Sequence, residues 1–216
     1  MANGKHAAIL GHSFVRRLCE SIELEDAQHT LFREYVPVSL NVDLCYRSIE
    51  VKGTSEALIE NLKAKIDSVT TEPVDIVVFI SGSNDLVDPT ADPKQLANRL
   101  VSLRDYARNR GVKLTVFCGA IHRNKCRGMV VSEFDDRVQR FNAHLHSLCT
   151  PAHLGRQFFG FKGFWREPDS STKLAVGKFS GDGIHPGPDI DSEGFQKFRR
   201  QLRRCLLAAV ARHESL

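Results

Sequence analysis

Two runs of consecutive β-branched and aromatic residues constrain the fold more than any other feature of the sequence. They read VDIVVFI at residues 74–80 and KLTVFCG at residues 113–119. A strand with one face in water alternates apolar and polar residues, whereas an unbroken apolar run is typical of a strand that is covered on both faces. Helices cover both faces of parallel sheets, so the two runs predict central strands of a largely parallel sheet.

Further strands and helices are predicted around these two runs. HAAIL at 6–10 predicts a third strand, and weaker strands are predicted at 44–51 and 156–161. Segments with helical periodicity lie between or after the strands, at 14–22, 54–66, 93–111, 133–149 and 193–213. This alternation predicts an α/β protein, a three-layer α/β/α sandwich with about five mostly parallel strands. Ligands of such sheets bind beyond the carboxyl ends of the strands.

Length and composition suit one compact domain that spans residues 1–216. Of the 216 residues, 42% are hydrophobic, which is enough for a sizeable core. No run approaches the roughly 18 apolar residues of a membrane-spanning helix, and the N-terminus has no apolar stretch of signal-peptide length. We therefore expect an intracellular protein, or a domain of a larger one, whose six cysteines are reduced thiols.

A mild excess of positive charge is concentrated near the C-terminus. The formal net charge is +4, and KFRRQLRR at 197–204 contributes four arginines, Arg199, Arg200, Arg203 and Arg204. A basic helix of this kind is either a solvated face or a surface that contacts nucleic acid. The sequence favours the solvated face and leaves contact with nucleic acid open.

Residues suited to acyl transfer stand where predicted strands end and in a late loop. They are Ser13, Gly53, Asn84 in SGSNDL, and Asp182 with His185 in SGDGIHPG. A serine nucleophile needs a base, a group that orients the base, and donors for the developing oxyanion. Ser13, His185 and Asp182 can fill the first three roles. The backbone N–H groups of Ser13 and Gly53 and the amide of Asn84 can supply the donors.

Ser13 has a second explanation as the cap of the helix that is predicted to follow it. A serine hydroxyl at a helix start accepts a hydrogen bond from an otherwise unpaired backbone N–H group. The two explanations are compatible, because the positive end of a helix dipole also stabilises a developing negative charge.

The same residues lie in four blocks that resemble those of the SGNH hydrolases, the GDSL-type esterase and lipase superfamily. The blocks are ILGHSF, VKGTS, SGSNDL and DGIHP, in the order of that family. RFNAHLHSL and the C-terminal GFQKF…LRRCLLAAV also resemble its helices, so the resemblance covers nearly the whole chain. It implies a flavodoxin-like three-layer sandwich that hydrolyses small acyl esters, such as esters of carbohydrates or lipids, without a metal or an organic cofactor.

The resemblance also implies a role for each site residue. Ser13 is the nucleophile and an oxyanion donor, Gly53 and Asn84 complete the oxyanion hole, and Asp182 orients the general base His185. The Ser…Asp…His order also occurs in the α/β-hydrolases. Their G-x-S-x-G elbow is absent, because a valine follows two residues after the serine.

His12 is the one departure from the family pattern. The first block of the family usually reads Gly-Asp-Ser, and that carboxylate helps to position the oxyanion region. An imidazole at this place carries a charge that depends on pH. His12 is therefore a tolerated replacement, a modulator of specificity or of the pH optimum, or a sign of lost catalysis.

A binding module with the same fold is the second hypothesis for function. It would bind acylated ligands, lipid or nucleic acid without hydrolysis. GHSF also resembles the start of SGNH domains in animal sequences, some of them associated with retroelement open reading frames. RNKCRG at 123–128 follows a predicted strand. It is either a solvated loop or a basic lip of the site that favours anionic or polar acyl substrates.

Overall fold

The structure is a computed structural model that describes a five-stranded sheet, four long helices and parts of the loops between them. The described residues are 5–11, 13–15, 40–45, 58–126, 128–150, 157–161, 179–185, 187 and 192–215. The elements in chain order are β1 (Lys5–Gly11), β2 (Leu40–Cys45), α2 (Leu58–Val69), β3 (Ile76–Ile80), the short 3-10 helix η1 (Asp85–Val87), α3 (Pro93–Arg108), β4 (Leu114–Cys118), α4 (Val131–Leu148), β5 (Phe158–Phe159) and α5 (Glu193–His213). Residues 13–15 also have helical backbone.

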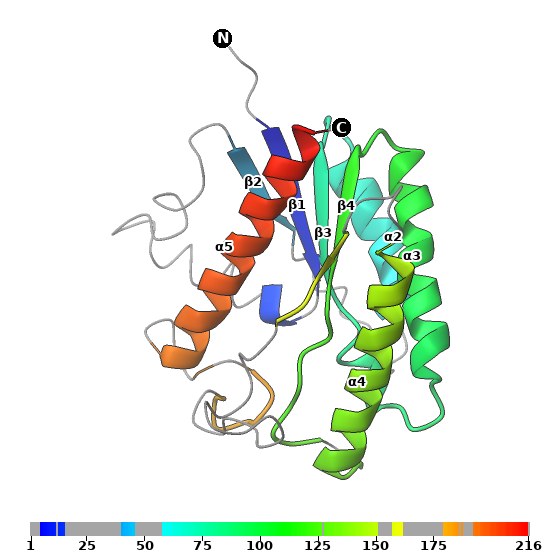
Figure 1. The fold of residues 1–216 in the computed structure, drawn as a ribbon, viewed down its shortest axis with the longest axis vertical. Coiled ribbons are helices and arrows are strands. Elements are labelled where there is room, and N and C mark those ends of the chain that lie inside the picture. Colours follow the sequence, from blue (N-terminus) through cyan, green and yellow to red (C-terminus); the bar gives the residue numbers. More distant parts are fainter. Residues whose placement is uncertain are drawn as a thin grey trace.

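The strands form one sheet in the order β2-β1-β3-β4-β5 (Figure 1). Every neighbouring pair is parallel, so all the described strands end at the same edge of the sheet. The chain order reverses between β1 and β3, and open α/β sheets bind ligands at such a point. The predicted three-layer sandwich with a parallel sheet is confirmed.

Helices cover the sheet on both faces, which explains the unbroken apolar runs in the sequence. α5 and the helical residues 13–15 pack on one face, whereas α2, α3 and α4 pack on the other (Figure 1). Consecutive side chains of a strand point to opposite faces. Val78 of β3 accordingly lies in the core under α5, and the next residue, Phe79, lies in the core under the other helices. Both side chains are fully buried.

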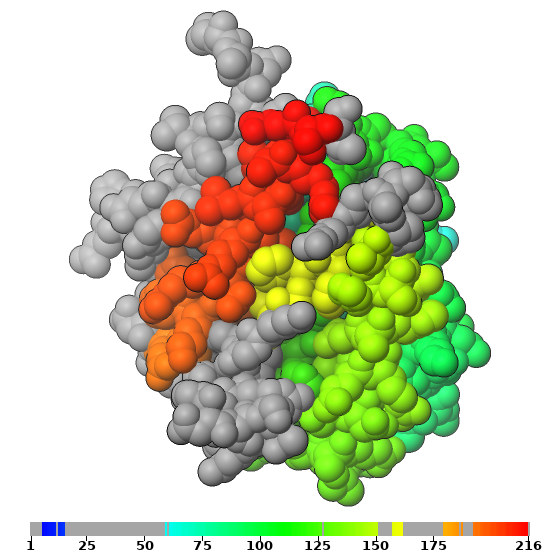
Figure 2. Space-filling model, in the orientation of Figure 1, coloured from blue at the N-terminus to red at the C-terminus, as the bar shows by residue number. Residues whose placement is uncertain are grey.

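α5 follows the predicted boundaries because one of its faces is apolar along its whole length. Its buried side chains recur every three or four residues from Phe195 to Val210, as an amphipathic helix requires. The hydroxyl of Ser192 caps its first turn by accepting from Phe195 N, 3.3 Å away. The β5 segment, whose Phe158 and Phe159 are half-buried, reaches the surface between α5 and α4 (Figure 2).

The second strand begins earlier than predicted. A strand was predicted at 44–51, whereas β2 covers Leu40–Cys45, so the two overlap at residues 44 and 45. Parallel pairing with β1 accounts for the earlier start, since Lys5 lies opposite Leu40 and Leu10 lies opposite Cys45. Residues 46–51 lie outside the described residues.

The helix predicted at 54–66 ends later in the chain than predicted. α2 runs from Leu58 to Val69, and residues 54–57 lie outside the described residues. Its C-terminal end extends beyond Ile66 because Val69, one turn later on the same face, is buried in the core as well.

The four arginines of the basic segment do not face solvent together. Arg199 is only 5% exposed, because it lies on the core side of α5. Arg203 is half-buried, and only Arg200 and Arg204 are exposed. The charge run is therefore divided between different faces of the helix. None of the helices in the described part of the chain has the length and apolar character that a membrane crossing needs.

Candidate active site

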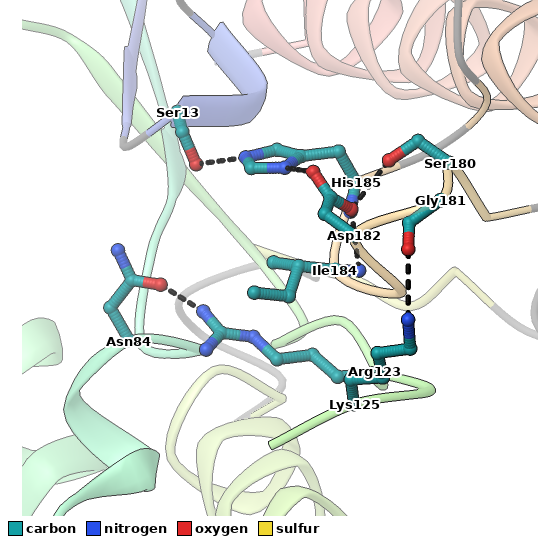
Figure 3. Close-up of polar contacts among 9 residues, drawn as sticks. All are labelled: Ser13, Asn84, Arg123, Lys125, Ser180, Gly181, Asp182, Ile184 and His185. Carbon is teal, nitrogen blue, oxygen red and sulfur yellow. Dashed lines mark hydrogen bonds and ion pairs between the residues drawn. The ribbon is translucent and has the colours of Figure 1, made fainter. Parts of the chain in front are cut away.

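The carboxyl edge of the sheet brings together residues from distant parts of the sequence. Ser13 follows β1 and Asn84 follows β3. Arg123 lies after β4, and Asp182 and His185 lie in the loop before α5. Figure 3 shows these side chains converging at one place. This is the edge at which the alternation of strands and helices predicts a site.

Ser13, His185 and Asp182 form a continuous hydrogen-bonded chain (Figure 3). His185 Nε2 lies 2.7 Å from Ser13 Oγ, and His185 Nδ1 lies 2.6 Å from Asp182 Oδ2. An ionised carboxylate can only accept a hydrogen bond, so Nδ1 donates to it and Nε2 is left to accept from the serine hydroxyl. This is the protonation state in which an imidazole can act as a base toward the serine.

The loop before α5 holds Asp182 in place and favours its ionised form. Oδ1 of Asp182 accepts from the backbone N–H groups of Ile184 at 2.8 Å and His185 at 3.0 Å, and from the hydroxyl of Ser180. Partial burial raises the pKa of this carboxyl, but the hydrogen bonds from Ser180, His185 and Ile184 outweigh it and hold the pKa well below its ordinary value. Gly183, with φ of +66°, permits the tight turn between the acid and the base.

His185 packs against the hydrophobic core through Phe14. The Phe14 ring is fully buried and its centroid lies 5.4 Å from that of the imidazole. The centroid of the Phe14 ring also lies 5.9 Å from that of Phe198 on α5. Phe14 therefore fixes its neighbour Ser13 to the core, and it also supports the His185 imidazole that contacts Ser13.

Asn84 lies at the start of η1 and is hydrogen-bonded to Arg123. The Nη2 group of Arg123 donates to Asn84 Oδ1 (Figure 3). The amide nitrogen of Asn84 points away from Arg123, toward the side on which Ser13 lies. An amide in this orientation presents N–H donors to a group bound beside the serine.

The loop that follows Asn84 is held by a buried arginine of α4. Arg137 donates to the backbone oxygens of Leu86 at 2.9 Å, Asp88 at 2.5 Å and Ala91 at 2.6 Å. Only 6% of the surface of Arg137 is exposed, so these bonds form away from water. They fix the backbone that carries Asn84 relative to α4.

Asp85, the neighbour of Asn84, makes stability depend on pH. It is 7% exposed, and burial raises its pKa from 3.8 to about 6 although the charges of Arg123 and Arg99 oppose this. Between these two pH values the unfolded chain loses this proton while the folded chain keeps it, so stability falls as the pH rises. The loss is complete above about pH 6 and amounts to about 3 kcal/mol.

We therefore expect Asp85→Asn to stabilise the protein at high pH more than at low pH. The gain in unfolding free energy should grow by about 3 kcal/mol between roughly pH 3 and pH 8, because the amide never ionises. Urea unfolding of both proteins at several pH values measures this difference, and the other titrating groups cancel in it. A difference that stays constant with pH would contradict the burial of an ionisable group at this position.

Most of the predicted site residues are brought together, and two lie outside the described residues. Ser13, Asn84, Asp182 and His185 are at the same edge of the sheet, whereas Gly53 and His12 are not described. Within the described part of the chain, no three His, Cys, Asp or Glu side chains gather as they would around a metal ion.

The contact between Arg123 and Asn84 was not predicted from the sequence. The segment 123–128 was predicted to be either a solvated loop or a basic lip of the site. Arg123 is instead 6% exposed and reaches Asn84, whereas Lys125 is exposed. The only signal in the sequence was the position of Arg123 shortly after a strand end.

Comparison with solved structures supports the fold over almost the whole chain. A GDSL-like lipase from Bacteroides thetaiotaomicron has a TM-score of 0.64 at 13% identity, covering 97% of this chain and 93% of that chain. A member of the lipolytic G-D-S-L family from Veillonella parvula has a TM-score of 0.59 at 15% identity, covering 93% and 97%. An acetylxylan esterase from Geobacillus stearothermophilus has a TM-score of 0.58 at 15% identity, covering 94% and 95%.

No protein-family model and no curated protein matches the sequence. At such low identities, the structural likeness shows the fold alone. The chain has the fold of the SGNH, or GDSL-type, hydrolases. The resemblance that the four sequence blocks indicated is thereby confirmed in the fold.

Proposed function

We propose that this protein is a serine carboxylic ester hydrolase that works through an acyl-enzyme on Ser13. The observation that carries the proposal is the hydrogen-bonded chain from Ser13 through His185 to Asp182, with distances of 2.7 and 2.6 Å. These three residues lie at the edge of the sheet where ligands of this fold class bind. Solved structures of the same fold include a lipase and an acetylxylan esterase.

The first half of the reaction forms the acyl-enzyme. His185 Nε2 takes the proton of the Ser13 hydroxyl as Oγ attacks the ester carbonyl carbon, which gives a tetrahedral oxyanion. Asp182 holds the imidazole in the required tautomer and stabilises its positive charge. The proton on Nε2 then passes to the leaving alcohol as the carbon–oxygen bond of the ester breaks.

The second half repeats these steps with water. Water attacks the acyl carbon and gives a proton to His185 Nε2, and that proton returns to Ser13 Oγ as the acid leaves. The oxyanion accepts hydrogen bonds from the N–H groups of Ser13 and Gly53 and from the Asn84 amide. The residues of this chain supply every proton transfer in the scheme.

Small acyl esters, with an acetyl or another short acyl chain, are the proposed substrates. The solved structures of this fold include one named as an acetylxylan esterase, an enzyme for acetyl esters of a carbohydrate, and one named as a carbohydrate esterase of family 3. We propose the same class of substrate here, with the alcohol supplied by a carbohydrate, a lipid or another small molecule.

Two measurements test the proposal. The first is hydrolysis of p-nitrophenyl acetate, butyrate and octanoate, for which we expect turnover that falls as the acyl chain lengthens. The second is labelling with a fluorophosphonate, which we expect to modify Ser13, as peptide mass spectrometry would show. If no ester is hydrolysed and Ser13 stays unlabelled, the esterase proposal fails and a binding module with this fold takes its place.

The Asn84→Ala variant tests the oxyanion hole. Loss of one preorganised donor is expected to lower kcat by about 10²–10³-fold, equivalent to roughly 2.7–4 kcal/mol. Steady-state hydrolysis of p-nitrophenyl acetate measures this change. Asn98→Ala is the matched control, because Asn98 is exposed on α3 and, among the described residues, its side chain is hydrogen-bonded only to His144. Nearly full activity of Asn84→Ala would show that the oxyanion lies elsewhere.

A further inference from the structure

Arg123 is a buried cation beside the residue that the proposed function assigns to the oxyanion hole. Only 6% of its surface is exposed. Burial lowers the pKa of its guanidinium, while the charges of Cys126, Asp182 and Asp85 oppose this. An apolar side chain would fill this space without desolvating a charge. The reason for a buried arginine at this position must therefore lie in what it binds, and it binds Asn84.

Nothing else in the described part of the chain fixes the Asn84 side chain. Asparagine at the start of a helix usually caps it, yet the Asn84 side chain makes no capping bond to η1. The nearby N–H groups already have partners, since Leu86 N donates to Gly82 O and Val87 N donates to Asn84 O. Within that part of the chain, Arg123 is the only hydrogen-bond partner of the Asn84 side chain.

The contact decides which end of the amide faces the site. The oxygen and the nitrogen of an asparagine side chain have almost the same shape, so only hydrogen bonds distinguish the two orientations. A guanidinium has donors and no acceptor, so it selects the orientation in which Oδ1 faces Arg123. The N–H groups of Asn84 then point away from Arg123 (Figure 3). In the opposite orientation, the carbonyl oxygen would face the developing oxyanion and repel it.

Arg123 is itself held in place by the two loops on either side of it. The hydroxyl of Ser83 accepts from Ile121 N at 2.8 Å and donates to Ile121 O at 3.2 Å. Asn124 N donates to Gly183 O at 2.7 Å, in the loop that carries the acid and the base. The segment around Arg123 thus joins the loop that carries Ser83 and Asn84 to the loop before α5.

We propose that Arg123 is a positioning residue that fixes the Asn84 amide with its N–H groups toward the oxyanion, a role that rests on the proposed esterase function. The positive charge also polarises the amide by donating to its oxygen, which makes the N–H groups better donors. Arg123 acts through Asn84 and does not touch the reacting atoms.

An NMR experiment tests the orientation independently of activity. In ¹⁵N-labelled protein, the side-chain NH₂ signals of Asn84 are identified by their absence from the Asn84→Ala variant. We expect Arg123→Met to shift these signals and to lower their heteronuclear NOE, because the amide is no longer held. Arg108→Met is the matched control, since this exposed arginine ends α3 near the opposite edge of the sheet, and it should leave the signals unchanged.

A double-mutant cycle tests the effect on hydrolysis. Arg123→Met should lower kcat by at least roughly tenfold, but by no more than the 10²–10³-fold or so expected for loss of the Asn84 donor itself. KM should change by less than about threefold, since the lost contact acts in the transition state. In the Asn84→Ala background, the same substitution should change kcat by less than about twofold, because its target is gone.

Each outcome decides the proposal. Unchanged Asn84 signals in Arg123→Met overturn it, and so does an equal loss of kcat in both backgrounds. Shifted signals in a protein that hydrolyses no ester support the positioning role and reject the esterase function. If Arg123→Met does not fold, Arg123→Gln replaces it with the same criteria, because the glutamine amide ends where Nε of arginine lies and cannot reach Asn84.

Discussion

Replacing Ser13 by alanine is expected to lower kcat for p-nitrophenyl acetate by about 10⁶-fold, the size of loss seen when a serine nucleophile is removed. The change removes the only atom that the proposed mechanism joins to the acyl group. Residual turnover should come from water that attacks ester held at the oxyanion donors, and such sites still exceed the uncatalysed rate by roughly 10³–10⁴-fold. Fluorophosphonate labelling should disappear with the activity.

Stability should change little in this variant, which separates lost chemistry from lost structure. Ser13 is half-buried, and of the hydrogen bonds among the described residues the substitution removes one, to His185. We expect a change in unfolding free energy of about 1 kcal/mol, measured by urea unfolding. Ser102→Ala is the matched control, since within the described part of the chain its exposed hydroxyl on α3 bonds only to Arg99 O. Ser13→Ala activity within about tenfold of wild type would place the nucleophile elsewhere.

The central strands were predictable because burial on both faces leaves a direct trace in the sequence. β3 and β4 contain no alternation, since consecutive side chains enter two different cores. The start of β2 was misplaced because it depends on pairing with β1, a contact between segments about 35 residues apart in the sequence. Local composition does not encode such a register.

The candidate site likewise contains contacts that local sequence predicts and contacts that it does not. Asp182 and His185 lie three residues apart in one turn, so local sequence predicts their hydrogen bond. The link from His185 to Ser13 was inferred from the chemistry of acyl transfer and the family resemblance, and it spans most of the chain. The contact between Arg123 and Asn84 was indicated neither by local sequence nor by the chemistry of acyl transfer and the family resemblance. It joins two loops through the Arg123 side chain, whose guanidinium lies over the ring of Phe134 in the core.

Replacing Asp182 by asparagine is expected to lower kcat by about 10⁴-fold, with little change in the shape of the site. An asparagine oxygen can still accept from the backbone N–H groups of Ile184 and His185, which fixes the oxygen on that side. The amide nitrogen then faces His185 Nδ1 and donates to it. Nδ1 must accept, so the ring proton moves to Nε2, which can no longer take the proton of Ser13.

This prediction has a spectroscopic signature that a loss of folding would not produce. The ¹⁵N shifts of His185 should show a proton on Nδ1 in the wild type and on Nε2 in Asp182→Asn. Because hydrogen bonds keep the pKa of Asp182 below its ordinary value, the wild-type carboxylate stays ionised from about pH 5 to pH 9. The difference in kcat between the two proteins should therefore not shrink at the acid end through protonation of Asp182.

Asp136→Asn is the matched control for loss of a carboxylate. Asp136 is exposed on α4 and pairs with Arg140 four residues later, so its removal should alter stability by at most about 0.5 kcal/mol and leave kcat unchanged. If Asp182→Asn keeps more than about a tenth of the wild-type kcat while the His185 tautomer has switched, the imidazole is not the base. If the tautomer has not switched, Asp182 does not control it, and the orienting role proposed for this carboxylate is wrong.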